Sequence, residues 1–266
     1  MRFFLFENTC YHSDAFPLML RVAGAENSVS GRRSRLIFVA LISLVFQLPI
    51  SAWALATSNN NNVVDEQVCN PLADYFLGME DYDEAIQRHR VVVRDDPTNA
   101  LAHYHLGFAY GVTGQHQKEL AEYQRAVNLG LDDWQLFLNL GLAYLEQGQT
   151  ADATAVLRMA TLLGPARPET HFNLALAYER RGALAQAEQE ALLSLQIDPN
   201  QPDARNTLGA IYAEEGKFRR AGEEWRNLMS ANPDYTPART NLTILQNVKS
   251  DPPKGTVGVS VFTHSP

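Results

Sequence analysis

The chain has 266 residues, of which 45% are hydrophobic and 20% are charged, a composition typical of a folded protein rather than a disordered one. The segment that ends at Ala56 holds five of the 22 basic and three of the 30 acidic residues, which leaves 17 basic against 27 acidic residues in the body. This acidic balance argues against nucleic-acid binding, and two cysteines exclude a disulfide scaffold and a cysteine-rich metal domain.

The N-terminal part has the pattern of a secretory signal. A basic cluster at residues 32–35 precedes residues 36–56, which carry no charge and end in Ala54-Leu55-Ala56. We therefore expect cleavage after Ala56, with residues 57–65 as a polar linker. The alternative is an uncleaved membrane anchor, because residues 36–56 are long enough to span a bilayer. Both alternatives place the body outside the cytoplasm.

The body repeats itself every 34 residues. This step separates four tyrosines (Tyr110, Tyr144, Tyr178, Tyr212), four glycines (Gly114, Gly148, Gly182, Gly216) and six leucines (Leu72, Leu106, Leu140, Leu174, Leu208, Leu242). Several columns of residues in one register indicate an array of similar units.

Within each unit the apolar spacing predicts two helices. In the third unit, Phe137, Leu140 and Tyr144 recur at the spacing of one helix face, and Gly148 is a typical helix stop. A second apolar face follows and ends near Pro165. Each unit therefore reads as a helix–turn–helix.

These columns resemble the consensus of the tetratricopeptide repeat (TPR) family. The fifth unit carries most of the family pattern in Leu208, Gly209, Tyr212, Gly216, Ala221, Trp225 and Pro233, whereas the first has Glu80 where the family has glycine. The resemblance covers five units at residues 66–99, 100–133, 134–167, 168–201 and 202–235. Repeat positions below are counted from the first residue of each unit.

The resemblance implies an all-α, right-handed superhelical solenoid. Residues 236–248 continue the lattice and are expected to form a C-terminal capping helix, followed by a flexible tail at 249–266. Within a unit, we expect a small residue such as Gly141 on the first helix to face alanines such as Ala153 on the second.

In the TPR family the first helices line a concave groove at repeat positions 2, 5, 6, 9, 12 and 13. The resemblance therefore implies a peptide-binding groove across units 2 to 4, lined by Tyr104, His105, Phe108, Leu138, Asn139, Leu142, Phe172, Asn173 and Leu176. The alternative is that the apolar members are ordinary packing between helices.

Position 6 holds Asn139, Asn173 and Asn241, with His105 in the equivalent place of unit 2. A carboxamide offers a donor and an acceptor, so this column could pair with the backbone of an extended peptide. The carboxylate clamp of chaperone-binding TPR proteins is not expected, because Tyr104 and Glu169 stand where it needs cations.

No constellation typical of catalysis, cofactor binding or metal binding was found in the sequence. His103 and His105 are two residues apart on a helix, so they point to different sides and cannot share a metal. His103 and His171, both at position 4, are expected to be core or surface histidines. Cys69 is expected to be a buried thiol, since no His/Asp setting accompanies it.

These observations predict a non-catalytic adaptor that binds other proteins. It would capture an extended, partly apolar peptide in the groove, and its acidic surface would favour a basic or neutral partner. The expected location is the bacterial periplasm, with a role in assembling the cell envelope. The alternative function is a structural scaffold that docks through its convex face or its tail.

Overall fold

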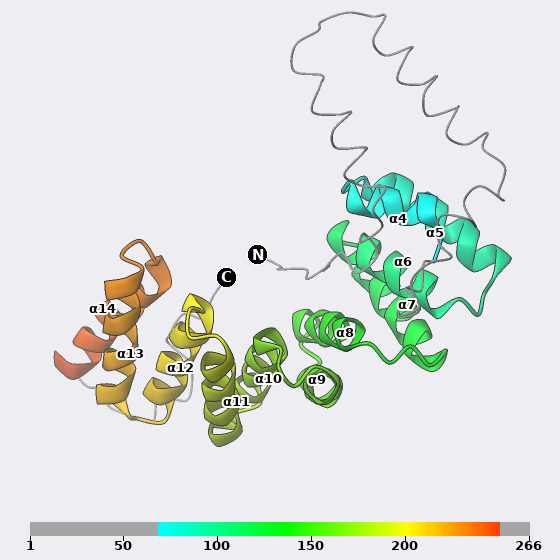
Figure 1. Cartoon of the computed structure of the whole chain (residues 1–266). Coiled ribbons are helices and arrows are strands. Elements are labelled where there is room, and N and C mark those ends of the chain that lie inside the picture. Colours follow the sequence, from blue (N-terminus) through cyan, green and yellow to red (C-terminus); the bar gives the residue numbers. More distant parts are fainter. Residues whose placement is uncertain (1–68, 251–266) are drawn as a thin grey trace, which may run out of the picture.

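The computed structural model describes residues 69–250. This part of the chain forms eleven helices and no strand, which confirms an all-α repeat solenoid (Figure 1). The helices are α4 (Pro71–Gly78), α5 (Tyr82–Asp95), α6 (Ala100–Val112), α7 (His116–Asn128), α8 (Trp134–Glu146), α9 (Thr150–Leu163), α10 (Pro168–Arg180), α11 (Leu184–Ile197), α12 (Pro202–Glu214), α13 (Phe218–Ala231) and α14 (Thr236–Ser250). The expected signal segment, linker and most of the expected tail lie outside these residues.

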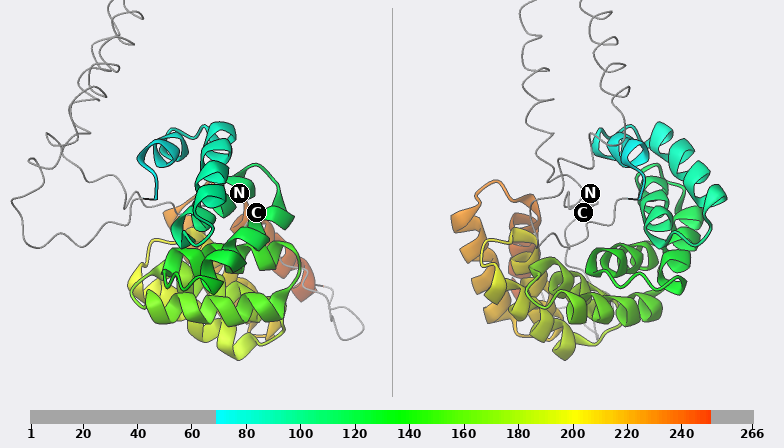
Figure 2. Two further views of the ribbon diagram at one scale, coloured as in Figure 1. Left: turned by 90° about the vertical axis from the view of Figure 1, so that its right-hand side faces the viewer. Right: turned by 45° about the vertical axis from the view of Figure 1, so that its right-hand side comes forward.

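The helices form five antiparallel pairs and a final single helix, arranged along an open arc in Figure 2. Each first helix touches the first helices of the neighbouring units, as α8 touches α6 and α10, whereas the second helices α7, α9 and α11 do not touch one another. In a curved stack the inner layer is the more closely spaced one. The first helices therefore line the concave side and the second helices the convex side.

The turns inside the units depend on one backbone conformation. Gly114, Gly148, Gly182 and Gly216 follow their helices with φ between 72° and 74°. This left-handed conformation suits glycine at the end of a helix. Glu80 takes the same place in the first unit with φ 59°, so the array keeps its turn there despite the missing glycine.

A close approach between the two helices of a unit explains the small residue at position 8. A Cβ added to Gly141 would lie 2.4 Å from Leu157, and one added to Gly209 would lie 2.5 Å from Trp225. The atoms nearest to the added Cβ belong to position 24, and at Gly107 the carbonyl oxygen of Glu119, at position 20, also lies 3.3 Å away. The larger side chain at position 24 is the one that covers the small residue.

Position 4 joins consecutive units. His103 Nδ1 lies 2.6 Å from Glu122, and its Nε2 lies 3.2 Å from the carbonyl of Pro97 in the preceding unit. His171 repeats this arrangement with Glu190 and Pro165. These two histidines are therefore structural, as the sequence predicted.

Both ends of the array differ from its middle. The helix α4 is only eight residues long. It begins at Pro71, and the side chain of Asn70 caps its N-terminus. At the other end α14 runs two residues beyond the predicted capping helix and buries Ala238 and Leu245. None of the helices in the described part of the chain has the length and apolarity that a membrane crossing requires.

Candidate functional site

The predicted groove residues lie on three neighbouring first helices, α6, α8 and α10. Five of them, on α6 and α8, are buried: Tyr104, His105, Phe108, Leu138 and Asn139. The other four, on α8 and α10, are half-buried: Leu142, Phe172, Asn173 and Leu176. The partly accessible portion of the predicted groove is therefore centred on α10.

The buried apolar members also pack between helices. Tyr104 and Phe108 belong to the core cluster of the first units, where the Tyr104 ring lies 5.9 Å from that of Tyr123 and the Phe108 ring 6.3 Å from that of Tyr82. Leu138 belongs to the next core cluster along the array. The packing alternative therefore describes these three side chains well.

The position-6 column joins neighbouring first helices. Asn139 Nδ2 donates to the Tyr104 hydroxyl at 3.1 Å, and Asn241 Nδ2 donates to Asn206 Oδ1 at 3.0 Å. In both pairs the donor lies 35 residues after the acceptor. Asn173 instead donates to the carbonyl of Glu169 on its own helix.

Some acceptors on these first helices are left without a donor. Asn139 Oδ1 and Thr207 Oγ1, both at position 6, are buried and form no hydrogen bond with any described residue. Glu169 Oε2, at position 2 of α10, is in the same state. Buried acceptors without partners cost free energy, and a donor from outside the protein would reach these atoms only if the side chains that cover them moved.

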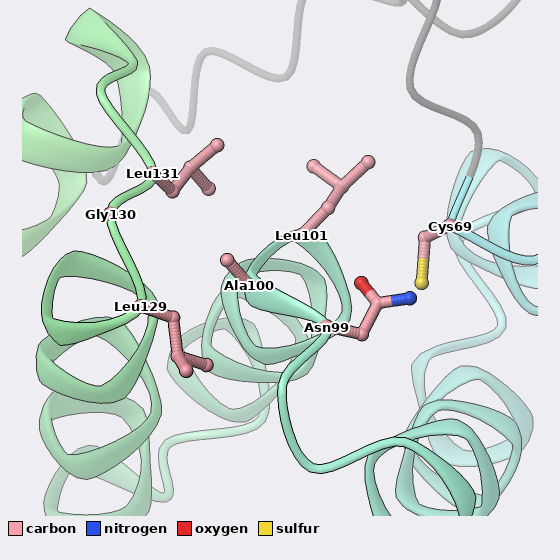
Figure 3. Close-up of a pocket in the computed structure, with 7 residues that line it drawn as sticks. All are labelled: Cys69, Asn99, Ala100, Leu101, Leu129, Gly130 and Leu131. Atoms are coloured by element: carbon pink, nitrogen blue, oxygen red, sulfur yellow. The ribbon is translucent and has the colours of Figure 1, made fainter.

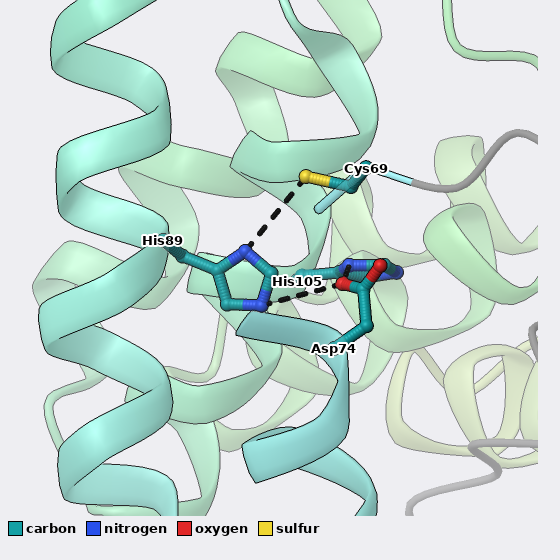
Figure 4. A group of neighbouring side chains, drawn as sticks. All are labelled: Cys69, Asp74, His89 and His105. Atoms are coloured by element: carbon teal, nitrogen blue, oxygen red, sulfur yellow. Dashed lines mark hydrogen bonds and ion pairs between the residues drawn. The ribbon is translucent and has the colours of Figure 1, made fainter. Parts of the chain in front are cut away.

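A second group of polar side chains lies near the N-terminal end of the described array. Cys69, Asp74, His89 and His105 each offer one ligand atom, and these atoms all lie within 4.8 Å of one another (Figure 4). Cys69 Sγ is 3.9 Å from His89 Nδ1, His89 Nε2 is 3.6 Å from Asp74 Oδ1, and His105 Nδ1 is 2.8 Å from the same oxygen. The expectation that Cys69 lacks a His/Asp setting was therefore wrong.

The environment of this group controls its protonation. Burial, aided by the neighbouring charge of His105, lowers the pKa of His89 to about 3, so this imidazole is neutral at neutral pH. Burial alone would raise the pKa of Asp74. The hydrogen bond and charge of His105, together with the charge of His89 and the Asn70 amide, nevertheless lower it. Asp74 is therefore a carboxylate beside two imidazoles.

A pocket of about 410 Å³ opens beside Cys69. In Figure 3 the Cys69 sulfur lies at one side of this pocket, Leu129 and Leu131 lie at the other, and Asn99 to Leu101 lie between them. Cys69 is half-buried, whereas Asp74, His89 and His105 are buried. The thiol is therefore the accessible member of the group.

The sequence analysis did not predict Asp74 and His89 as members of a polar group. They stand at positions 9 and 24, where the other four units have only apolar residues (Phe108, Leu142, Leu176, Ala210 and Tyr123, Leu157, Ala191, Trp225). Two polar exceptions at otherwise apolar positions of a single unit were the available signal.

The fold and sequence were compared with known proteins. The family model for the tetratricopeptide repeat matches residues 70–133 and 138–202. A search of curated protein sequences found no match.

Three solved structures illustrate the similarity in fold. YrrB, described as a TPR protein with an unusual peptide-binding site, is 21% identical with a TM-score of 0.59 over 67% of this chain and 88% of its own. PilF from Pseudomonas aeruginosa is 23% identical with a TM-score of 0.57, over 68% and 82%. MamA from Desulfovibrio magneticus RS-1 is 18% identical with a TM-score of 0.58, over 62% and 93%.

Proposed function

The chain belongs to the tetratricopeptide repeat family, whose members are generally non-catalytic protein-interaction modules, and from this premise we propose that it captures an extended peptide on its concave face. The proposed site comprises the face of α6, α8 and α10 in units 2 to 4.

The observation that carries the proposal is the buried oxygen of Asn139. Its Nδ2 is fixed by the Tyr104 hydroxyl, so the carboxamide cannot turn freely and its Oδ1 keeps one direction. That oxygen receives no hydrogen bond from the described residues. Because Asn139 is itself buried, a backbone N–H of a bound peptide would satisfy this oxygen only after the side chains that cover it move aside.

Neighbouring residues supply the rest of a peptide site. Leu142, Phe172 and Leu176 are half-buried on α8 and α10, so each retains apolar surface that a ligand side chain could cover. The Glu169 oxygen without a donor lies on the same helix as Phe172. It favours a ligand with an amide or a basic side chain, in line with the acidic composition of the body.

The fold of YrrB, the structure described with a peptide-binding site, is compatible with this use of the array. Peptide binding in this chain is inferred from its own residues, since the likeness to YrrB concerns the fold.

The binding experiment uses the full chain and a random-peptide display library. Selected peptides are labelled, and their affinities are measured by fluorescence polarisation against the wild type, Asn139→Leu and Phe172→Ala. Leucine keeps the approximate volume of Asn139 and removes its acceptor. We expect each substitution to weaken binding about tenfold, the effect of losing roughly 1.4 kcal/mol.

The matched control is Asn227→Leu, which makes the same chemical change at an exposed position of the second helix α13. Its affinity should equal that of the wild type. The proposal is wrong if the selected peptides bind Asn139→Leu, Phe172→Ala and the wild type alike.

A scaffold that docks through the convex face is the second candidate, because second helices expose large apolar side chains. Leu162 on α9 is 70% exposed, and Met159, Leu163, Leu192 and Ile197 on α9 and α11 are exposed as well. Peptides that lose affinity for Leu162→Ser, but not for Asn139→Leu, would favour this candidate.

Export to the bacterial periplasm and a role in envelope assembly form part of the proposal. Their support is the basic cluster at residues 32–35 followed by the uncharged stretch 36–56. A fusion of residues 1–65 to alkaline phosphatase, which is active only after export, would be active in bacterial cells. Deleting residues 36–56 should abolish that activity, and activity retained after the deletion would contradict export by this segment.

A further inference from the structure

We propose that Cys69, Asp74, His89 and His105 form a binding site for a divalent transition-metal ion of the zinc type. The site would lie in the core of the first unit and at its junction with the second. It shares His105 and α6 with the predicted groove, but the residues tested for peptide binding, Asn139 and Phe172, lie on α8 and α10, so either proposal can fail without the other.

The geometry of the four side chains suits one small ion. Ligand atoms of a tetrahedral zinc ion are about 3.3–3.7 Å apart, given metal–ligand bonds of about 2.0–2.3 Å. Here one ligand atom from each of the four residues lies within 4.8 Å of the other three, and Asp74 Oδ1 is 2.8 Å from His105 Nδ1. The 3.9 Å distance to Cys69 and the 3.6 Å distance to Asp74 involve different nitrogens of His89, of which one ion would take a single one. Figure 4 shows the four side chains gathered around one place, and a separation of 4.8 Å would have to shorten by about 1 Å for both atoms to bind one zinc ion.

The chemistry of the set selects the metal class. One thiolate, two imidazoles and one carboxylate combine the sulfur, nitrogen and oxygen ligands that zinc accepts, and hard calcium or magnesium sites use oxygen ligands instead. The thiolate and the carboxylate together balance the charge of a divalent ion. A buried site would therefore be close to neutral, which reduces the cost of burying its charges.

The cost of these residues without a ligand also supports the proposal. Asp74, His89 and His105 are all buried, and His89 Nε2 has no hydrogen bond in the described part of the chain beyond its 3.6 Å approach to Asp74. The other four units place apolar residues at positions 9 and 24, so the fold itself does not require an acid or a histidine there. Metal coordination would stabilise all three residues at once.

The ligands come from different elements, which suggests what the ion does. Cys69 precedes α4, Asp74 lies on α4, His89 on α5 and His105 on α6. The helix α4 is eight residues long, and helices of this length are marginal by themselves. Four protein ligands complete a tetrahedral shell, so the ion would hold α4 in place and would not open a position for catalysis. The pocket beside Cys69 provides a route of entry (Figure 3).

A Cys–His–Asp nucleophile is the competing interpretation of the same residues, because His89 Nδ1 faces the thiol and its Nε2 faces the carboxylate. Such a group needs an imidazole that accepts the thiol proton. The metal interpretation is favoured because it also accounts for His105, the fourth member, at 2.8 Å from Asp74.

The test uses the untagged full chain, stripped with a chelator and then given zinc or cobalt salts alone. Zinc content after dialysis is measured by mass spectrometry, affinity by competition with a chromogenic chelator, and coordination by the absorption spectrum of the cobalt form. We expect one ion per chain, a thiolate-to-cobalt charge-transfer band, the intense visible bands of tetrahedral cobalt, and a higher melting temperature.

The ligand variants are Cys69→Ser, Asp74→Asn and His89→Gln. The Cys69→Ser variant should lose the charge-transfer band, and each variant should bind zinc more than about 100-fold more weakly. His103→Gln and His171→Gln are matched controls, since these histidines pair with glutamates outside the cluster, and both should bind like the wild type.

Circular dichroism identifies any variant that fails to fold. Cys69 is the least buried ligand, so Cys69→Ser is the variant expected to keep the helical spectrum. The proposal is overturned if wild-type zinc affinity matches that of folded Cys69→Ser, or if the cobalt form lacks the thiolate band. Fast alkylation of Cys69 that zinc does not slow would also overturn it, and would favour the nucleophile instead.

Discussion

His105 and Asp74, 31 residues apart, are joined by a buried contact of 2.8 Å between the imidazole Nδ1 and the carboxylate. It connects the first helices of units 1 and 2. At the equivalent positions of units 2 and 3, Asn139 and Phe108 replace this polar pair by a carboxamide and an aromatic ring. The junction of units 1 and 2 therefore has a buried polar contact at positions where the junction of units 2 and 3 has none of this kind.

Replacing the buried polar group by its counterparts from unit 3 should stabilise the metal-free protein. The triple variant Asp74→Leu, His89→Leu, His105→Asn carries the residues found at Leu142, Leu157 and Asn139. His89 is neutral at neutral pH, so the pair that matters is Asp74 and His105, and exchanging a buried pair of this kind for apolar residues often adds about 1–4 kcal/mol. Urea unfolding in the presence of a chelator should show a gain of that order.

The single variant Asp74→Leu is the contrast. It leaves His89 and His105 buried without their carboxylate, and removing one partner of such a pair typically costs about 3–5 kcal/mol. If the single and triple variants are destabilised equally, the polar group is not the source of the effect.

Acid should weaken the metal-free protein in a defined window. His89 has an ordinary pKa of 6.5 and a pKa of about 3 in the fold, where Asp74 from α4, His105 from α6 and Cys69 surround it. The pKa of His89 is lower in the folded protein than in the unfolded one, so the protein has its full free energy of unfolding above pH 6.5. The contribution of His89 is lost as the pH falls from 6.5 towards 3, because only the unfolded chain takes up the proton.

The measurement is the urea midpoint of the chelator-treated protein at a series of pH values within that window. His89→Leu should flatten the dependence of the urea midpoint on pH. The pKa of Asp74 is lowered from 3.8, so its contribution falls away only below that value. A slope that survives in His89→Leu would contradict the assignment.

Glu80→Gly should stabilise the array. Glu80 lies in the left-handed region, where a non-glycine residue costs about 1–2 kcal/mol of strain. Glycine removes this strain, but it also makes the unfolded chain more flexible, which cancels part of the gain. We expect a gain of about 0.5–1 kcal/mol in thermal or urea unfolding. The reverse change, Gly114→Ala at φ 74°, should destabilise the protein by a similar amount. Equal stabilities of the two variants would refute the explanation.

The repeat architecture could be predicted from the 34-residue spacing. This architecture depends on local rules, which are helical spacing, glycine turns and a capping segment. The Cys69 group depends on a relation between columns. Cys69 alone resembles a packing thiol, and it gains chemical meaning only when the stacking of α4, α5 and α6 brings Asp74, His89 and His105 to it. The polar residues Asp74 and His89, at repeat positions that are apolar in the other units, indicate this cluster only when both positions are considered together.

The same limit applies to the groove. The family pattern placed Tyr104 and Phe172 together as lining residues, yet the structure buries Tyr104 beside Tyr123 and leaves Phe172 half-buried. Which member of a concave column becomes core depends on the side chains that adjacent helices present. Those contacts are set by packing across units, which the spacing within one unit does not encode.

The contact between the two helices of a unit leads to a last prediction. Gly141→Ala places a Cβ 2.4 Å from Leu157, so a core side chain must move, and overpacking of this kind costs about 1–3 kcal/mol. The fourth unit shows how the clash can be removed, because it has alanine at both equivalent positions, Ala175 and Ala191.

In a Leu157→Ala background, Gly141→Ala should therefore be close to neutral or even stabilising, since the new methyl fills part of the space that leucine vacated. The four proteins form a double-mutant cycle measured by urea unfolding. A coupling energy of at least about 1 kcal/mol is expected from relief of the clash. Additive effects would mean that position 24 does not determine the size of position 8, and that the small residue has another cause.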